Sequence, residues 1–117
     1  MEGRRIGRIE EQLRIELSEI IEQEVSDPRI GLVTVTGVKV SPDLRHARVF
    51  VSVLGDAEQR QKTLKGLTSA ASYARRSLSQ RLQHLRRTPE LTFVYDDSLE
   101  KSLRIEELFD QIKPENE

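Results

Sequence analysis

The sequence predicts an α+β domain in which helices pack on one face of a small three-stranded sheet. Two kinds of apolar spacing indicate this class: steps of three and four residues, typical of helices, and strict alternation, typical of strands. These segments follow the order helix, strand, strand, helix, helix, strand and short helix. The chain has 117 residues, so we expect one domain, 1–112, followed by a short tail, 113–117.

A first helix and a hairpin of two strands are predicted from the N-terminal half. Apolar residues lie three or four apart through 6–24, which predicts an amphipathic helix that ends before Asp27-Pro28. Valines then alternate with polar residues through 33–40, but the apolar frame moves by one residue at Gly37, which predicts a β-bulge. A Ser-Pro-Asp turn leads into a second alternating segment, 47–53, so we expect an antiparallel hairpin.

Two successive helices are predicted after the hairpin. Asp56 is a candidate N-cap for the first of them. The stretch 57–87 is too long for a comfortable single helix in so small a domain. We therefore expect an interhelical kink at the small residues Ala70, Ala71 and Ser72.

The C-terminal part predicts a third strand and a last short helix. Thr88-Pro89 ends the second of the two helices, and residues 91–95 alternate as a strand. Asp97 and Glu100 have the spacing of a capping box, which predicts a helix from there to about Phe109.

Positive charge is concentrated in residues 69–88, a segment without a single carboxylate in a chain whose formal net charge is only −1. On a helical projection the apolar side chains of this segment fall on one side and the arginines on the other, with Arg81 at the border. The predicted basic face consists of Arg75, Arg76, Arg81, Arg86 and Arg87. Such clustering is typical of a surface that binds a phosphate-bearing partner rather than of a solvated helix face.

Some residues keep two interpretations. Arg4, Arg5 and Arg8 are either further contacts to the phosphate-bearing partner or part of a flexible terminus. Tyr73 either stacks on a base of such a partner or joins the core. Arg81 either contacts the partner or covers the core with its aliphatic stem.

Composition argues against several functional classes. The chain has no cysteine, so thiolate metal sites, disulfides and cysteine nucleophiles are excluded. Asp96-Asp97 resembles a nuclease metal pair less than it resembles a helix N-cap, and the two histidines lack a nucleophile beside them, so we expect no enzyme, no cofactor and no metal. No run of apolar residues suits a membrane span or a secretory signal, so we expect a cytoplasmic protein without membrane contact.

Five segments follow one another at characteristic spacing: Arg4-Arg5-Ile6, Ser26-Asp27-Pro28-Arg29-Ile30, Val33-Thr34-Val35-Thr36-Gly37-Val38, Ser41-Pro42-Asp43-Leu44 with Ala47-Arg48-Val49, and Thr88-Pro89-Glu90-Leu91 with Tyr95-Asp96-Asp97-Ser98. In this order and spacing, over about residues 4–109, they resemble the bacterial ribosome-binding factor A family of small-subunit assembly factors. The resemblance implies a type II KH-like domain with the order αββααβ. It also implies an interhelical kink built on Ala, any residue and Gly, where Ser72 takes the glycine position in this chain.

The function that this resemblance implies is binding of the immature small (30S) ribosomal subunit, in support of late maturation and processing of its 16S rRNA and of cold adaptation. Partners would be the subunit, its rRNA and an assembly GTPase, and the protein would act as a monomer. The GXXG loop with which ordinary KH domains clamp single strands is absent from the sequence. A general module for single-stranded RNA is the alternative, and four arginine contacts to folded RNA predict a slope of log affinity against log salt of about −3 to −4.

Overall fold

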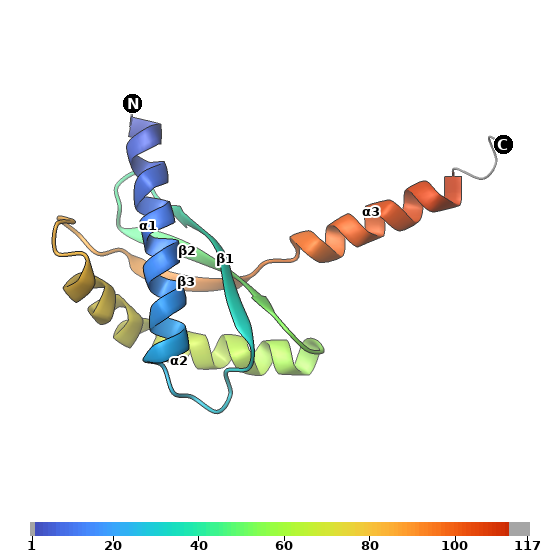
Figure 1. Ribbon diagram of the computed structural model, residues 1–117, viewed down its shortest axis with the longest axis horizontal. Coiled ribbons are helices and arrows are strands. Elements are labelled where there is room, and N and C mark those ends of the chain that lie inside the picture. The colour runs from blue at the N-terminus through green and yellow to red at the C-terminus, as the bar shows by residue number, and fades with distance from the viewer. Residues whose placement is uncertain (1, 113–117) are drawn as a thin grey trace.

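The computed structural model describes residues 2–112, so Met1 and the predicted tail, 113–117, lie outside the described residues. Within residues 2–112, six elements follow one another, and Figure 1 shows their arrangement. They are α1 (Glu2–Gln23), β1 (Val33–Val40), β2 (His46–Val53), α2 (Ala57–Arg81), β3 (Glu90–Tyr95) and α3 (Ser98–Ile112). The predicted α+β class is confirmed.

The three strands form one sheet in the order β1-β2-β3. Strands β1 and β2 pair antiparallel, which confirms the hairpin, whereas β3 lies parallel to β2. The predicted bulge is also confirmed, because Val35 pairs with Val51 and the next pair joins Gly37 to Phe50. Thr36 is the extra residue, and the bulge lets valines on both sides of it point into the same core.

The hydrophobic core lies between one face of the sheet and helices α1 and α2. Alternate strand residues such as Val49, Val51 and Phe93 are buried, and their neighbours along each strand are exposed or half-buried. From α1, Leu13 and Leu17 are completely buried against them. The apolar residues of the helices and those of the strands thus pack together in a single core.

Helix α2 replaces the two successive helices that the sequence predicts. Its hydrogen bonding is helical throughout residues 57–81, and Asp56 caps it as predicted, in a capping box with Gln59. Figure 1 shows that the helix changes direction between its yellow-green first part and its gold last part. A bent continuous helix therefore takes the place of two helices with a junction, and the kink at Ala70, Ala71 and Ser72 stays a prediction.

The expected continuation of helix from 82 to 87 is wrong. Helix α2 ends at Arg81, and Leu82 leaves the helical region with a φ of −116° and a ψ of 56°. Leu82 and Leu85 nevertheless both pack on the core, because a turn closed by the Leu85 amide and the Leu82 carbonyl, 3.0 Å apart, brings the second leucine back inward. Leu82 and Leu85, three residues apart, thus continue the apolar spacing of α2 although both lie beyond the end of the helix.

Helix α3 differs from the expected packing, because it extends away from the sheet and does not cover it (Figure 1). Leu103, Ile105 and Leu108 are each more than half exposed along it. The predicted capping box of Asp97 with Glu100 is also wrong: Glu100 instead accepts hydrogen bonds from Arg60 and Tyr95. These contacts join the start of α3 to α2 and β3 without burying the helix.

Candidate nucleic-acid interface

Residues 82–89 connect α2 to β3 and carry two of the predicted arginines; we call them the basic loop. Leu82 is buried at its start, Leu85 packs partly on the core, and Pro89 is completely buried at its end. Arg86 and Arg87 lie between these anchors and are exposed. The loop is thus held at apolar points and directs its charged side chains outward.

Four of the predicted arginines line one surface hollow of about 460 Å³ between α2 and the basic loop; we call it the arginine hollow. Arg75 and Arg76 reach it from α2, and Arg86 and Arg87 from the loop. Three hydroxyl-bearing residues and one leucine complete its lining. These are Ser72, Ser79, Thr88 and Leu85. Cationic and hydroxyl donors around a concave surface suit an oxyanion such as an RNA phosphate.

Arg75 and Arg76 are adjacent in sequence but have different surroundings. The Nε and Nη2 atoms of Arg75 both donate to the carbonyl oxygen of Thr88, at 3.1 and 3.0 Å. Arg75 therefore ties α2 to the end of the basic loop. Among the side chains that the structure describes, no ion pair joins Arg76, Arg86 or Arg87 to a carboxylate.

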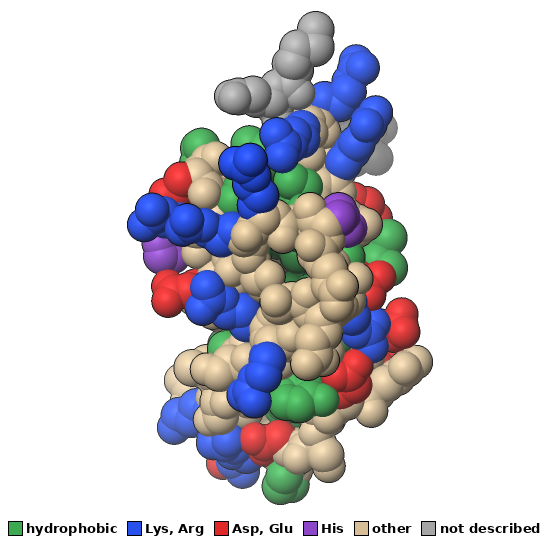
Figure 2. Space-filling model, turned by 90° about the vertical axis from the view of Figure 1, so that its left-hand side faces the viewer, with side chains coloured by type: hydrophobic (Ala, Val, Ile, Leu, Met, Phe, Trp, Pro, Cys, Tyr) green, Lys and Arg blue, Asp and Glu red, His purple; other side chains and the backbone are tan. Residues whose placement is uncertain are grey.

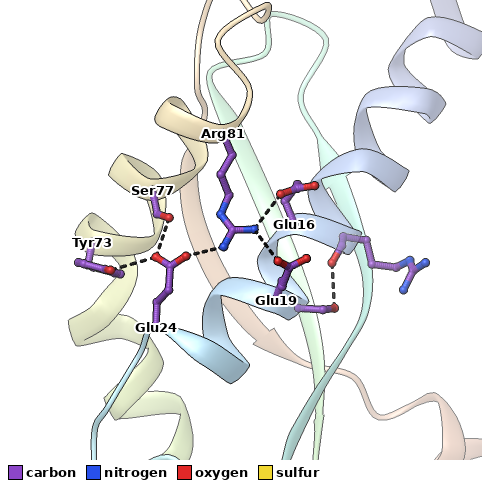
Figure 3. A network of polar contacts seen from close by, with 8 residues as sticks. Glu16, Glu19, Glu24, Tyr73, Ser77 and Arg81 are labelled. Atoms are coloured by element: carbon purple, nitrogen blue, oxygen red, sulfur yellow. Dashed lines mark hydrogen bonds and ion pairs between the residues drawn. The ribbon is translucent and has the colours of Figure 1, made fainter.

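Arg81 does not belong to this exposed set, and its role as an RNA contact stays a prediction. Its guanidinium lies between carboxylates of α1, with Nη1 at 2.9 Å from Glu16 and 3.3 Å from Glu19, while Nη2 pairs with Glu24 just beyond the helix (Figure 3). Only 23% of its side chain is exposed. The acidic neighbours come from a distant part of the chain, so the local absence of carboxylates did not reveal them.

Glu24 is the second centre of the same network. Besides Arg81, it accepts hydrogen bonds from the hydroxyls of Tyr73 at 2.9 Å and Ser77 at 2.8 Å (Figure 3). These donors, Arg81 first, lower the pKa of Glu24. The hydrogen bond to Glu24 in turn raises the pKa of Tyr73, whose side chain is neither in the core nor fully exposed. The network fastens the end of α1 to the last part of α2.

Arg4, Arg5 and Arg8 lie on the first turns of α1 and are exposed. Beyond them, Glu10 accepts a hydrogen bond from the amide of Val40 at 2.9 Å, which places this end of α1 beside the end of β1. The basic loop enters the sheet at the same end, since the Glu90 amide donates to the Arg45 carbonyl at 2.8 Å. In Figure 2, which faces this side, Lys and Arg side chains gather above and along the middle, and acidic ones lie mainly at the margins.

Of the predicted kink residues, Ser72 is exposed and lines the arginine hollow, whereas Ala70 and Ala71 are half-buried.

Asp96 accepts hydrogen bonds from Ser98 and from the Thr36 hydroxyl, and the bond from Thr36 is 2.6 Å long. Asp96 thereby holds the start of α3 to the bulge in β1. Among the described residues, no three His, Asp or Glu side chains gather as metal ligands would. Nor does any helix within 2–112 have the length and apolar character to cross a membrane.

A mixed three-stranded sheet, two helices on one of its faces and an arginine-lined hollow beside the last strand define a small KH-like domain with a candidate nucleic-acid interface. The sequence profile of ribosome-binding factor A matches residues 5–109. The chain belongs to the ribosome-binding factor A family.

Individual relatives agree with this assignment. Ribosome-binding factor A of Halothermothrix orenii is 50% identical over all 117 residues of this chain, which span 95% of that protein. The crystal structure of ribosome-binding factor A from Thermus thermophilus is 32% identical, with a TM-score of 0.67 over 77% of this chain and 94% of the other. A solution structure of a putative ribosome binding factor A from Thermotoga maritima is 33% identical, with a TM-score of 0.69 over 78% and 86% of the two chains.

A third structure concerns a complex. It is a homology model of the Thermus thermophilus protein fitted into the cryo-EM map of that protein with the 30S subunit. Its identity to this chain is 32%, and the TM-score is 0.62 over 75% of this chain and 91% of the other.

Proposed function

We propose that this protein binds the immature small ribosomal subunit, through the arginine hollow, and supports the late maturation and processing of its 16S rRNA, with a role in adaptation to cold. The observation that carries the proposal is the convergence of Arg76, Arg86 and Arg87, from two different elements, on one concave surface. Membership in the ribosome-binding factor A family and the fitted 30S complex of the Thermus thermophilus relative support the choice of partner.

The chemistry of the site favours binding over catalysis. Arginines that meet phosphates release condensed counterions, which supplies affinity but carries no sequence information. Selectivity must then come from the fit of the whole face to folded RNA and adjacent ribosomal proteins. The protein would act without an enzymatic step, as a monomer in the cytoplasm, and an assembly GTPase is a candidate partner in its release.

Co-sedimentation with ribosomal particles tests this proposal. We expect the protein to sediment with immature small subunits, to be absent from complete ribosomes, and to bind naked single-stranded RNA more weakly at moderate salt. Equal affinity for naked single strands would favour the general RNA-binding module. RNA incubated with the protein and magnesium should stay intact, and cleavage that Asp96→Ala abolishes would favour a nuclease.

The triple variant R76Q/R86Q/R87Q should lose most of the sedimenting fraction, because it removes the three arginines of the hollow for which the described residues show neither an ion pair nor a side-chain hydrogen bond. The matched control is K62Q/K65Q/R104Q, which removes the same charge from the first part of α2 and from α3. An equal loss in both variants would mean that net charge, and not the arginine hollow, carries the binding.

A further inference from the structure

Within the described part of the chain, Arg75 donates hydrogen bonds to another residue through its guanidinium, whereas no such bond is found for Arg76, Arg86 or Arg87. Two of its three guanidinium nitrogens donate to a single acceptor, the Thr88 carbonyl oxygen. This two-pronged contact spans from the last part of α2 to the residue before the buried Pro89. The Nε and Nη2 atoms of Arg75 are thus already engaged within the protein.

The segment of the basic loop next to the Arg75 contact, residues 86–88, has few other hydrogen bonds among the described residues. In the described part of the chain, the turn bond from Leu85 to Leu82 precedes Arg86, and the next backbone hydrogen bond is that of Glu90. Within that part, residues 86–88 therefore have no hydrogen bond to another backbone group. Apolar anchoring at Leu85 and Pro89 limits the reach of the loop, but the contact with Arg75 is the hydrogen bond that fixes the Thr88 carbonyl.

Such a restraint matters because like charges converge here. Arg76, Arg86 and Arg87 line one hollow, and in the absence of an anion their mutual repulsion favours loop conformations that separate them. A loop held in place before binding loses less conformational entropy when the RNA arrives. Anchoring Thr88 would keep Arg86 and Arg87 facing Arg76.

We propose that Arg75 is a positioning residue, which holds the basic loop through the Thr88 carbonyl so that Arg76, Arg86 and Arg87 present a preformed site to RNA phosphates. The inference rests on the proposed function for its ligand, although the restraint itself belongs to the protein without RNA. Arg75 then contributes to affinity through the loop, whereas its three neighbours contribute through contact.

A double-mutant cycle on small-subunit binding separates these two roles. R75Q should weaken binding about tenfold in the otherwise unchanged protein, since the loop residues must then be ordered at the moment of binding. In the R86Q/R87Q background, the same change should weaken binding less than about twofold. Equal losses in both backgrounds would mean that Arg75 contacts phosphate directly, and would overturn the proposal.

The conservative variant R75K gives an independent readout. Lysine keeps the positive charge but lacks the planar fork that donates twice to one carbonyl. R75K should therefore behave like R75Q in both backgrounds. Full recovery of affinity by lysine would indicate a simple point-charge contact with RNA and contradict a positioning role.

Hydrogen exchange in the protein alone tests the restraint without any RNA. The hydrogen-bonded amides on either side of residues 86–88 are those of Leu85 and Glu90. They should exchange several-fold faster in R75Q than in R76Q, with the midpoint of thermal unfolding of both variants near that of the unchanged protein. Unaltered exchange in R75Q would overturn the positioning role. Absence of small-subunit binding in the unchanged protein would instead overturn the proposed function, with the exchange result still valid.

Discussion

At the scale of single residues, the arginines of the segment 69–88 take three different roles. Arg81 is an internal ion-pair partner of three carboxylates in and just after α1, Arg75 holds a backbone carbonyl, and Arg76 is exposed in the arginine hollow. Their local sequence is uniformly basic, so local composition does not distinguish these roles. What separates them is the partner that the fold brings to each side chain.

The Glu24 network predicts a loss of stability in acid. The pKa of Glu24 in the folded protein lies below its ordinary value of 4.5, chiefly because Arg81, Ser77 and Tyr73 donate to the carboxylate. A lowered pKa means that the Glu24 carboxylate takes up a proton less readily in the folded state than in the unfolded state. The stabilisation is therefore complete above about pH 5 and is lost as the pH falls through the lowered value.

The change that tests this is Glu24→Gln, which keeps a hydrogen-bond acceptor but removes the titrating charge. We expect E24Q to be less stable than the unchanged protein near neutral pH and to lose less further stability between about pH 5 and pH 3. Urea unfolding across this range measures both. Parallel pH profiles for the two proteins would contradict the role given to Glu24.

At the scale of elements, close packing around α2 overrides intrinsic helix propensity. Gly66 is buried within α2, and a Cβ atom built on it would lie 2.7 Å from Cγ1 of Ile30. Alanine normally stabilises a helix interior by about 1 kcal/mol relative to glycine. Here the added methyl group would force Ile30 or the helix to move, at a cost of about 1–3 kcal/mol.

We therefore expect Gly66→Ala to lower the free energy of unfolding, against its helix propensity. Gly7 in α1 is the matched control, because nothing lies within 4 Å of the position of its Cβ. Gly7→Ala should raise the free energy of unfolding by about 0.5–1 kcal/mol. Chemical denaturation of both variants makes the comparison, and a stabilised G66A would show that the contact with Ile30 relaxes without cost.

The elements differ in how far the sequence could predict them. Helix α1 and the strands were predictable because their apolar residues keep one period throughout, and the shift of frame at Gly37 indicated the bulge. The end of α2 was not, because Leu82 and Leu85 continue the apolar spacing through a turn. The orientation of α3 was not predictable either, since an amphipathic pattern does not show whether another element of the protein packs against the apolar face of the helix.

At the scale of the whole molecule, the candidate site was predictable in composition but not in geometry. Charge clustering identified Arg75, Arg76, Arg86 and Arg87. Their arrangement around a hollow depends on the end of α2 and the return of the basic loop, which bring two elements together. Contacts as distant as those of Arg81 with Glu16 exist only once α1 and α2 have packed.

The central claim is that the arginine hollow binds phosphates of folded small-subunit RNA. Affinity for immature small subunits, measured at several monovalent salt concentrations and constant magnesium, tests it most directly for the unchanged protein and for R76Q/R86Q/R87Q. We expect binding to weaken steeply with salt, and the slope of log affinity against log salt to be shallower by about 2 to 3 in the variant, because three phosphate contacts are lost. Equal slopes and equal affinities in the two proteins would contradict the claim.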